Sequence, residues 1–242
     1  WDGFRYYRLA GEQFEARGAP NTFSDARVRA EYINLSTSTD FYSTSTPYLP
    51  KVWNSPDWIN YDTINIDSSN ITSDLTDFPV YVDLSDLGDT FWTTVSDDGV
   101  DIRVTNDAGV ELPREVVSAS TSLRTGELHF KADSISSSTN TNFHIYYNGT
   151  TTRDYDRTHT YGSENVWTNE YVAVWHFDED PGIAGIGGIL DSTSYGNHAT
   201  DTGGMGASNM VTNGAVGQAF TFGNGSGCLL YTSDAADEYS GV

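Results

Sequence analysis

The side chains best suited to chemistry in this sequence are carboxylates. One group follows the apolar run Val172–Phe177 and consists of Asp178, Glu179, Asp180 and Asp191. Carboxylate oxygens are the hard donors that Ca²⁺ prefers in proteins. We therefore name these four residues as a candidate calcium site. The alternative is turn formation, because Asp side chains accept hydrogen bonds from nearby backbone N–H groups.

A second acidic group consists of Asp97, Asp98 and Asp101 and contains Gly99. Neither group has the spacing of an EF-hand loop, which places its ligands at alternate positions and ends in Glu. A glycine beside Asx residues tolerates the positive φ of a tight turn. Turn formation is therefore the favoured interpretation for both groups, with calcium as the ligand to test.

The sequence offers little support for catalysis. It has no Gly-x-Ser-x-Gly motif, and its one cysteine, Cys228, stands in no recognisable nucleophile setting. Carboxylate pairs are too common in so acidic a chain to identify a glycosidase. The histidines show no i, i+4 pairing of the kind that binds zinc: His129, His144, His159, His176 and His198. We predict that the protein is not an enzyme.

The charge balance argues against a nucleic-acid partner. The formal net charge is −22, with only 12 Lys and Arg residues, and none of these follows Arg157. Phosphate contacts require cationic side chains, so we expect no nucleic-acid binding. No apolar run approaches the length of about 18 residues that spans a membrane, and we expect no membrane span.

Cationic residues gather near the N-terminus, at Arg5, Arg8, Arg17, Arg27 and Arg29. A charge-balanced N-terminal arm therefore precedes a strongly acidic body. On charge alone, the favoured interpretation is a solvated acidic surface that keeps an extracellular protein soluble. The alternative is that the arm binds the acidic body of a neighbouring copy.

Four N-x-[ST] sequons lie in expected loops or at strand ends, at Asn34, Asn70, Asn148 and Asn224. Such triplets are acceptors for N-linked glycans in secreted proteins. The segment STSTDFYSTSTP (36–47) also has the composition of an O-glycosylated linker. We name covalent glycans as a candidate modification, and an unmodified polar linker is the alternative.

Periodicity predicts an all-β protein built from antiparallel β-sandwich domains. Between residues 75 and 115, Phe78, Val80, Val82 and Leu84 alternate with outward residues, as in a half-buried strand. The turn sequences SDDG and NDAG follow, so we expect a β-meander here. The other expected strands are 4–9, 26–35, 58–66, 102–105, 112–117, 127–131, 143–147, 172–177 and 214–222.

Four motifs stand in this first part of the chain: LTDFPV (75–80), DGVDIR (98–103), LPRE (112–115) and YYNG (146–149). Together they resemble a domain of unknown function found in large prokaryotic surface proteins. The YYNG motif departs from the usual order, in which Gly precedes Asn. The strand that begins at Trp58 resembles the start of that domain.

Three further segments resemble the beginning of a laminin-G-like jelly roll of the concanavalin A type. They are VAVWHFDED (172–180), LDSTSYGNHATDTGG (190–204) and GAVGQAFTF (214–222). The resemblance implies a rim that binds glycans and often calcium, with Trp167, Tyr171 and Tyr195 as candidate glycan contacts. Too few strands are present for a complete jelly roll. The closing segment 228–240 resembles translated sequencing-adapter sequence, so we base no expectation on residues after Gly227.

We therefore expect three parts: an extended N-terminal arm and linker (1–50), a β-sandwich domain (51–158) and an incomplete jelly roll (166–242). Two strands and a linker cannot bury a core, so the arm must pair with its own body or with another molecule. The anchors of such an arm would be Phe4, Tyr6, Val28, Ala30 and Tyr32.

Two functions follow from this organisation. The first is a non-enzymatic extracellular subunit of a cell-surface filament or appendage, a homopolymer assembled by β-strand exchange of the arm. The second is an adhesin whose jelly roll binds glycans. We favour the filament, because the adhesin hypothesis leaves the unpaired arm unexplained.

Overall fold

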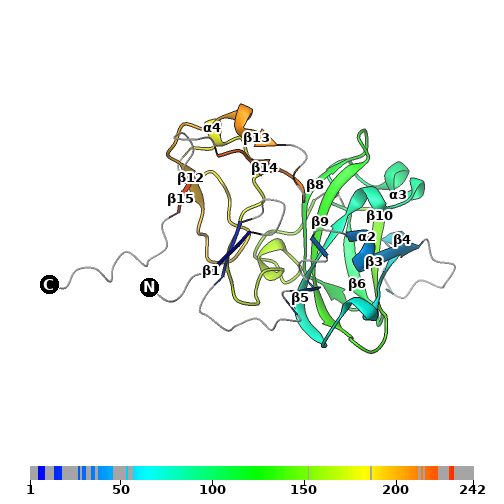
Figure 1. Ribbon diagram of the computed structural model, residues 1–242. Coiled ribbons are helices and arrows are strands. Elements are labelled where there is room, and N and C mark those ends of the chain that lie inside the picture. The colour runs from blue at the N-terminus through cyan, green and yellow to red at the C-terminus, as the bar shows by residue number, and fades with distance from the viewer. Residues whose placement is uncertain are drawn as a thin grey trace. The chain divides into compact units, whose positions relative to one another are not determined.

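The computed structural model describes residues 5–8, 14–17, 27, 29–30, 34–35, 38–45, 53, 57–151, 153–185, 187–211, 214, 216–222 and 229–231 (Figure 1). The chain forms two compact units. We call Asn21–Asn169 the central unit, and Trp1–Pro20 together with Glu170–Val242 the split unit. Each unit is described by itself.

The central unit contains a five-stranded antiparallel sheet whose long strands follow the expected alternation. In β4 and β10, Ile64, Ile66, Phe143 and Ile145 point to one face and are buried. Its strands, in spatial order, are β3 (Tyr42–Ser45), β4 (Trp58–Ile66), β10 (Thr141–Gly149), β6 (Arg103–Asn106) and β7 (Glu111–Leu112).

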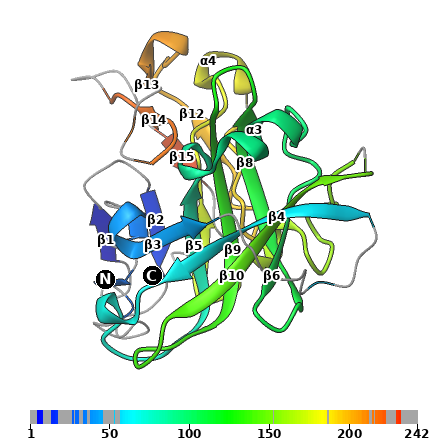
Figure 2. The same cartoon turned by 90° about the vertical axis from the view of Figure 1, so that its right-hand side faces the viewer.

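A three-stranded antiparallel sheet forms the second layer of the central unit, and Figure 2 shows its strands crossing behind β4 and β10. In spatial order these strands are β5 (Leu75–Asp83), β9 (Thr125–Ile135) and β8 (Arg114–Ser120). Strand β5 is therefore an edge strand, paired on one side with β9.

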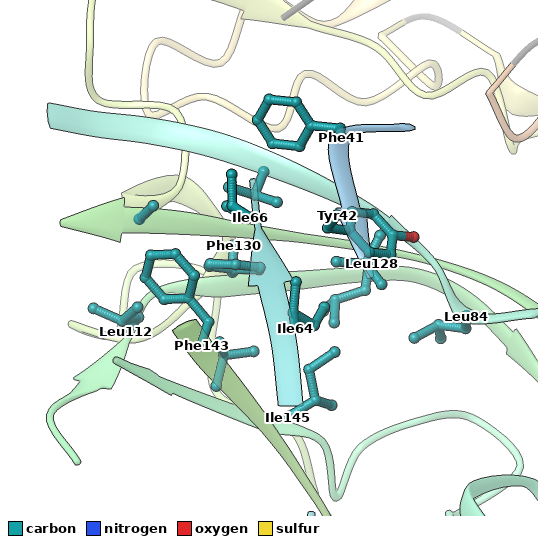
Figure 3. Close-up of a cluster of buried hydrophobic side chains, with 14 of the residues drawn as sticks. Phe41, Tyr42, Ile64, Ile66, Leu84, Leu112, Leu128, Phe130, Phe143 and Ile145 are labelled. Carbon is teal, nitrogen blue, oxygen red and sulfur yellow. The ribbon is translucent and has the colours of Figure 1, made fainter. Parts of the chain in front are cut away.

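The facing sides of the two sheets form one hydrophobic core (Figure 3). Ile64 and Phe143 from the five-stranded sheet meet Leu128 and Phe130 from β9, and all four are fully buried. The rings of Phe130 and Phe143 lie 5.0 Å apart, which joins the layers directly. The predicted all-β sandwich is confirmed.

The predicted β-meander over residues 75–115 is wrong in its connections. Strand β5 pairs with β9, whereas β6 pairs with β10 in the other sheet. Between them the chain forms the 3-10 turn η2 (Leu84–Asp86) and the helix α3 (Asp89–Thr94). Phe91 and Trp92 of α3 are buried. The chain crosses between layers here because both sheets bury their apolar faces against each other.

The described residues between positions 27 and 45 belong to the central unit and help to build its core. Helix α2 (Ser38–Phe41) leads into β3, and the side chains of Phe41, Tyr42 and Ala30 are buried in that core. The strand predicted over 26–35 is wrong for the described residues, since Arg27, Arg29, Ala30, Asn34 and Leu35 are helical. Arg and Ala are strong helix formers. The side chains of Arg27 and Asn34 join this segment to β5.

The split unit contains small antiparallel sheets. One has the order β1 (Arg5–Arg8), β2 (Phe14–Arg17) and β11 (Tyr171–Val174). The pair β12 (Ala199–Asp201) and β15 (Leu229–Tyr231) and the pair β13 (Met210–Val211) and β14 (Ala219–Phe220) complete the described strands. The buried cluster of this unit contains Ala173, Trp175, Phe177, Ile189, Ala199, Met205 and Phe220.

In the part of the chain that the structure describes, no helix is long and apolar enough to cross a membrane.

Candidate functional site

The outward edge of β5 is the most distinctive surface of the central unit. The side-chain amide of Asn34 pairs with both backbone groups of Tyr81: Oδ1 accepts from the Tyr81 N–H at 2.7 Å, and Nδ2 donates to its carbonyl at 2.8 Å. This is the bonding pattern that a neighbouring strand would offer. A single buried side chain therefore takes the place of a strand at this position.

The neighbouring positions on the same edge are also occupied. Asp83, two residues beyond Tyr81, donates its N–H to the Tyr42 hydroxyl at 3.0 Å. Pro79, two residues before Tyr81, has no N–H to offer. Because alternate residues of a strand point their N–H groups the same way, Pro79 removes one outward donor. Proline and covering side chains are means by which proteins protect edge strands.

The start of β5 is covered by a cation. Arg27 donates from Nη1 to the Thr76 carbonyl at 3.2 Å and from Nη2 to the Asp77 carbonyl at 3.3 Å. Its guanidinium lies 5.3 Å from the centre of the Phe78 ring. Asp77 has a φ of 49°, which interrupts the regular strand where these carbonyls turn outward. We call Arg27, Ala30 and Asn34 the edge plug.

The N-terminal segment also supplies strands to both units. In the split unit, β2 pairs with β11 of the same chain, and in the central unit β3 pairs with β4. Of the five predicted arm anchors, Ala30 is buried in the core and Tyr6 lies in β1. Phe4, Val28 and Tyr32 lie outside the described residues.

Among the candidate calcium ligands, Glu179 has a partly buried carboxylate with a raised pKa. Its Oε1 accepts from the Leu190 N–H at 3.0 Å, and its Oε2 is buried with no hydrogen-bond partner among the described residues. Burial raises the pKa of Glu179 to about 7, and the nearby charge of Asp178 adds to this effect. A carboxylate held in this way binds a proton readily, and a cation would relieve the same cost.

The other three candidates lie around Glu179 in different settings. Asp191 is fully buried, and its oxygens accept hydrogen bonds from Val174 N, Thr193 N, Thr193 Oγ1 and Asn197 N. Asp180 caps α4 (Pro181–Ala184) by accepting from Gly182 N, and Asp178 is exposed. Asp191 therefore anchors a loop, and a calcium ion would have to compete with four donors for its oxygens.

The second acidic group forms turns. Asp97 accepts from Thr121 N at 2.8 Å and from Thr121 Oγ1 at 2.6 Å, and these bonds lower the pKa of Asp97. Asp101 is buried and accepts from Ser96 N at 3.0 Å. Gly99 has a φ of 67°. Asp98 accepts from Val100 N, two residues on, at 3.4 Å, which agrees with the Asx-turn interpretation, whereas Asp97 and Asp101 bond to more distant backbone groups.

The sequons differ in accessibility. Asn34 is buried and uses both amide atoms on Tyr81, so a glycan on Nδ2 is incompatible with this conformation. Asn70 is half-buried in the turn η1 (Ser68–Asn70). Asn148 is half-buried at the end of β10 with a φ of 60°. Asn224 lies outside the described residues.

Sequence reasoning assigned no role to two buried arginines in the DGVDIR and LPRE motifs. Arg114, 1% exposed, binds both carboxylate oxygens of Asp154 and donates from Nε to the Ile102 carbonyl. The Arg103 guanidinium lies 4.2 Å from the centre of the Tyr155 ring. These arginines hold the segment after β10 against the sheet. Their place in the two motifs was the sequence feature that could have indicated this role.

Glu111 completes this network. It accepts from the Tyr155 hydroxyl at 2.9 Å and lies 3.6 Å from Arg103 Nε. Burial raises the pKa of Glu111, and burial followed by the charge of Arg114 lowers the pKa of Arg103. Tyr155 and Glu111 are hydrogen-bonded to each other, whereas Arg103 Nε is buried with no hydrogen-bond partner among the described residues and packs against the Tyr155 ring.

One arrangement has the residue types of a nucleophile and base. Thr63 Oγ1 lies 3.0 Å from His144 Nδ1, and His144 Nε2 lies 3.2 Å from Asp107 Oδ1. Thr63 stands in the middle of β4, between β3 and β10, so neighbouring N–H groups are engaged in strand pairing. An oxyanion hole needs free N–H donors at this place. We interpret the arrangement as a polar network on the outer face of the sheet.

The glycan contacts named from the sequence differ in their exposure. Trp167 and Tyr171 are buried, and Trp167 Nε1 donates to Glu115 at 2.6 Å, whereas Tyr195 is 67% exposed. A second aromatic group lies on the side of β4 and β10 away from the main core, where the Tyr146 ring contacts the rings of Trp53 and Tyr61. Tyr61 and Tyr146 are buried, so this group is a packed cluster and not a glycan surface.

Comparisons with protein-family models, with curated proteins and with solved structures found no match to this chain.

Proposed function

We propose that this protein is a non-enzymatic structural subunit of an extracellular filament or cell-surface appendage. Copies associate by exchanging their N-terminal segments. The observation that carries the proposal is the position of this segment in the sheets. Residues before position 46 supply β2 to β11, β3 to β4 and the amide of Asn34 to the edge of β5.

The same contacts can form between two copies without any new interface. A segment that occupies sheet edges in its own chain can occupy the equivalent edges of a neighbour, which is the principle of domain swapping. If each copy gives its segment to the next, the contact is head-to-tail and a filament can grow. Calcium and covalent glycans remain candidate additions to such a subunit.

A cysteine pair tests the exchange. Ser43 of β3 lies opposite Asn65 of β4 in an antiparallel pair, where Cα atoms are about 4.5–5.5 Å apart, within disulfide range. We would introduce Ser43→Cys and Asn65→Cys in a Cys228→Ser background. The control pair is Ser120→Cys with Thr125→Cys, which joins β8 to β9.

Exchange predicts ladders of disulfide-linked chains on non-reducing gels for the first pair and monomers for the control pair. Electron microscopy of native material should show filaments. Intramolecular bonds alone for both pairs, at filament-forming concentrations, would reject the proposal.

A second candidate function is a glycan-binding surface module. It is favoured by Tyr195, which is 67% exposed and is one of the aromatic contacts named from the sequence. Sugars bind to exposed aromatic faces. A glycan array that detects binding by the wild type and none after Tyr195→Ala would support this candidate.

A further inference from the structure

We propose that Asn34 is the latch for exchange at β5, and that the partner of the β5 edge is the edge plug of a second copy. This inference rests on the proposed function, because it names the residues that control exchange and the surface that receives them.

The occupied edge determines which partner fits. An ordinary added strand would donate and accept at alternate positions along β5. Pro79 cannot donate at its position, and Asp77, with its φ of 49°, breaks the regular geometry. The amide of Asn34 instead reaches a single residue, Tyr81, with bonds of 2.7 and 2.8 Å. The edge plug therefore fits this edge better than a foreign strand.

The other two members of the edge plug, Ala30 and Arg27, add contacts with the core and with the start of β5. Ala30 is 1% exposed and packs into the core of the sandwich. Arg27 brings a cation to the Thr76 and Asp77 carbonyls. Because the chain carries a formal net charge of −22, two copies repel each other overall, and the local contacts of the edge plug act against this repulsion.

A latch acts on the rate of exchange. The Asn34–Tyr81 pair is present in the closed chain and in the exchanged pair, so its loss weakens both states equally. The equilibrium constant between the closed and the exchanged state is then unchanged. The pair must break before the segment can leave, so its loss lowers the barrier to opening. This distinguishes a latch from a residue that merely stabilises one form.

The test compares Asn34→Ala with the wild type and with Asn165→Ala, which removes an amide that donates to the His159 carbonyl elsewhere in the central unit. Hydrogen exchange at the Tyr81 amide reports the latch in the monomer. Mixing of unlabelled with ¹⁵N-labelled protein, trapped through the Ser43→Cys and Asn65→Cys pair, reports exchange between copies.

We expect Asn34→Ala to speed both processes about 30-fold, as the loss of two buried hydrogen bonds predicts. The mixed fraction at equilibrium should stay unchanged, and Asn165→Ala should behave as the wild type. If Asn34→Ala fails to fold, Asn34→Ser removes both amide bonds to Tyr81 with a smaller, polar side chain and should accelerate both processes in the same direction.

The possible failures are distinguishable. Two results would overturn the latch while leaving segment exchange between copies intact. One is an unchanged rate of hydrogen exchange at the Tyr81 amide in Asn34→Ala. The other is faster hydrogen exchange at that amide with an unchanged rate of mixing between copies. Disulfides that never join unlabelled to labelled chains, in the wild type or the variant, overturn the latch and the proposed function together.

Discussion

Replacing Glu179 by Gln should remove a pH dependence of stability from the split unit. In the folded chain burial raises the Glu179 pKa to about 7, from an ordinary value of 4.5. The folded state therefore binds a proton more tightly than the unfolded state. Its stabilising effect is complete below pH 4.5 and is lost as the pH rises through 7.

The magnitude follows from these two values. At 1.36 kcal/mol for each pH unit between them, the upper bound is about 3 kcal/mol. The carboxylate is only partly buried, and water screens its charge, so we expect about 1 kcal/mol. The Gln side chain keeps an oxygen for the Leu190 N–H, which preserves the one hydrogen bond of Oε1.

Thermal unfolding between pH 5 and pH 8 measures this effect, with hydrogen exchange at the Leu190 amide as the local probe. The wild type should lose stability across this range, and Glu179→Gln should lose less. Glu170→Gln is the matched control, because Glu170 is an exposed carboxylate of the same unit. Equal pH slopes in the wild type and Glu179→Gln would refute the reasoning.

Calcium provides a second arm of the same experiment. A bound cation would keep Glu179 ionised and would restore the stability of the wild type at pH 8. It should have no such effect on Glu179→Gln. Calorimetry that detects no heat with calcium, together with an unchanged melting temperature, would remove the calcium proposal and leave the proton effect standing.

Three further changes test the central unit. Asp154→Ala should destabilise it by about 3 kcal/mol in urea unfolding, because the charge of Arg114 is left buried without its carboxylate. Adding Arg114→Met should recover part of that loss, and additive costs of the two changes would contradict this. Phe41→Ala should cost about 3 kcal/mol by opening a cavity in the core, and a cost below 1 kcal/mol would place this ring outside the core. Gly162→Ala should lower the melting temperature, since a Cβ there would lie 2.2 Å from a backbone oxygen, whereas Gly88→Ala, with no atom within 4 Å, should leave it unchanged.

Local alternation in the sequence was enough to locate the long strands. The prediction for 58–66 coincides with β4, and the alternation of Phe78, Val80 and Val82 lies within β5. Side chains at alternate positions share one face, so a strand with one buried face has apolar residues at every second position of its sequence. The SDDG sequence was sufficient to predict a tight turn at Gly99 for a different local reason, because glycine takes the positive φ of 67° that this turn requires.

Partners across the sandwich were decided only by the tertiary structure. Consecutive strands usually pair, which is why residues 75–115 were expected to form a meander, yet β5 and β6 lie in different sheets. The apolar face of one sheet must be covered by the other, and the crossing through α3 achieves this. A local pattern records that a face is buried but carries no information about what covers it.

Asn34 illustrates the same limit at the level of one side chain. Its sequence context is a glycosylation sequon, but folding brings it to Tyr81, 47 residues away, where it replaces a strand at the edge of β5. An amide has the same donor and acceptor in either setting. The sequence determined the chemical groups of Asn34, and the tertiary structure decided which groups they meet.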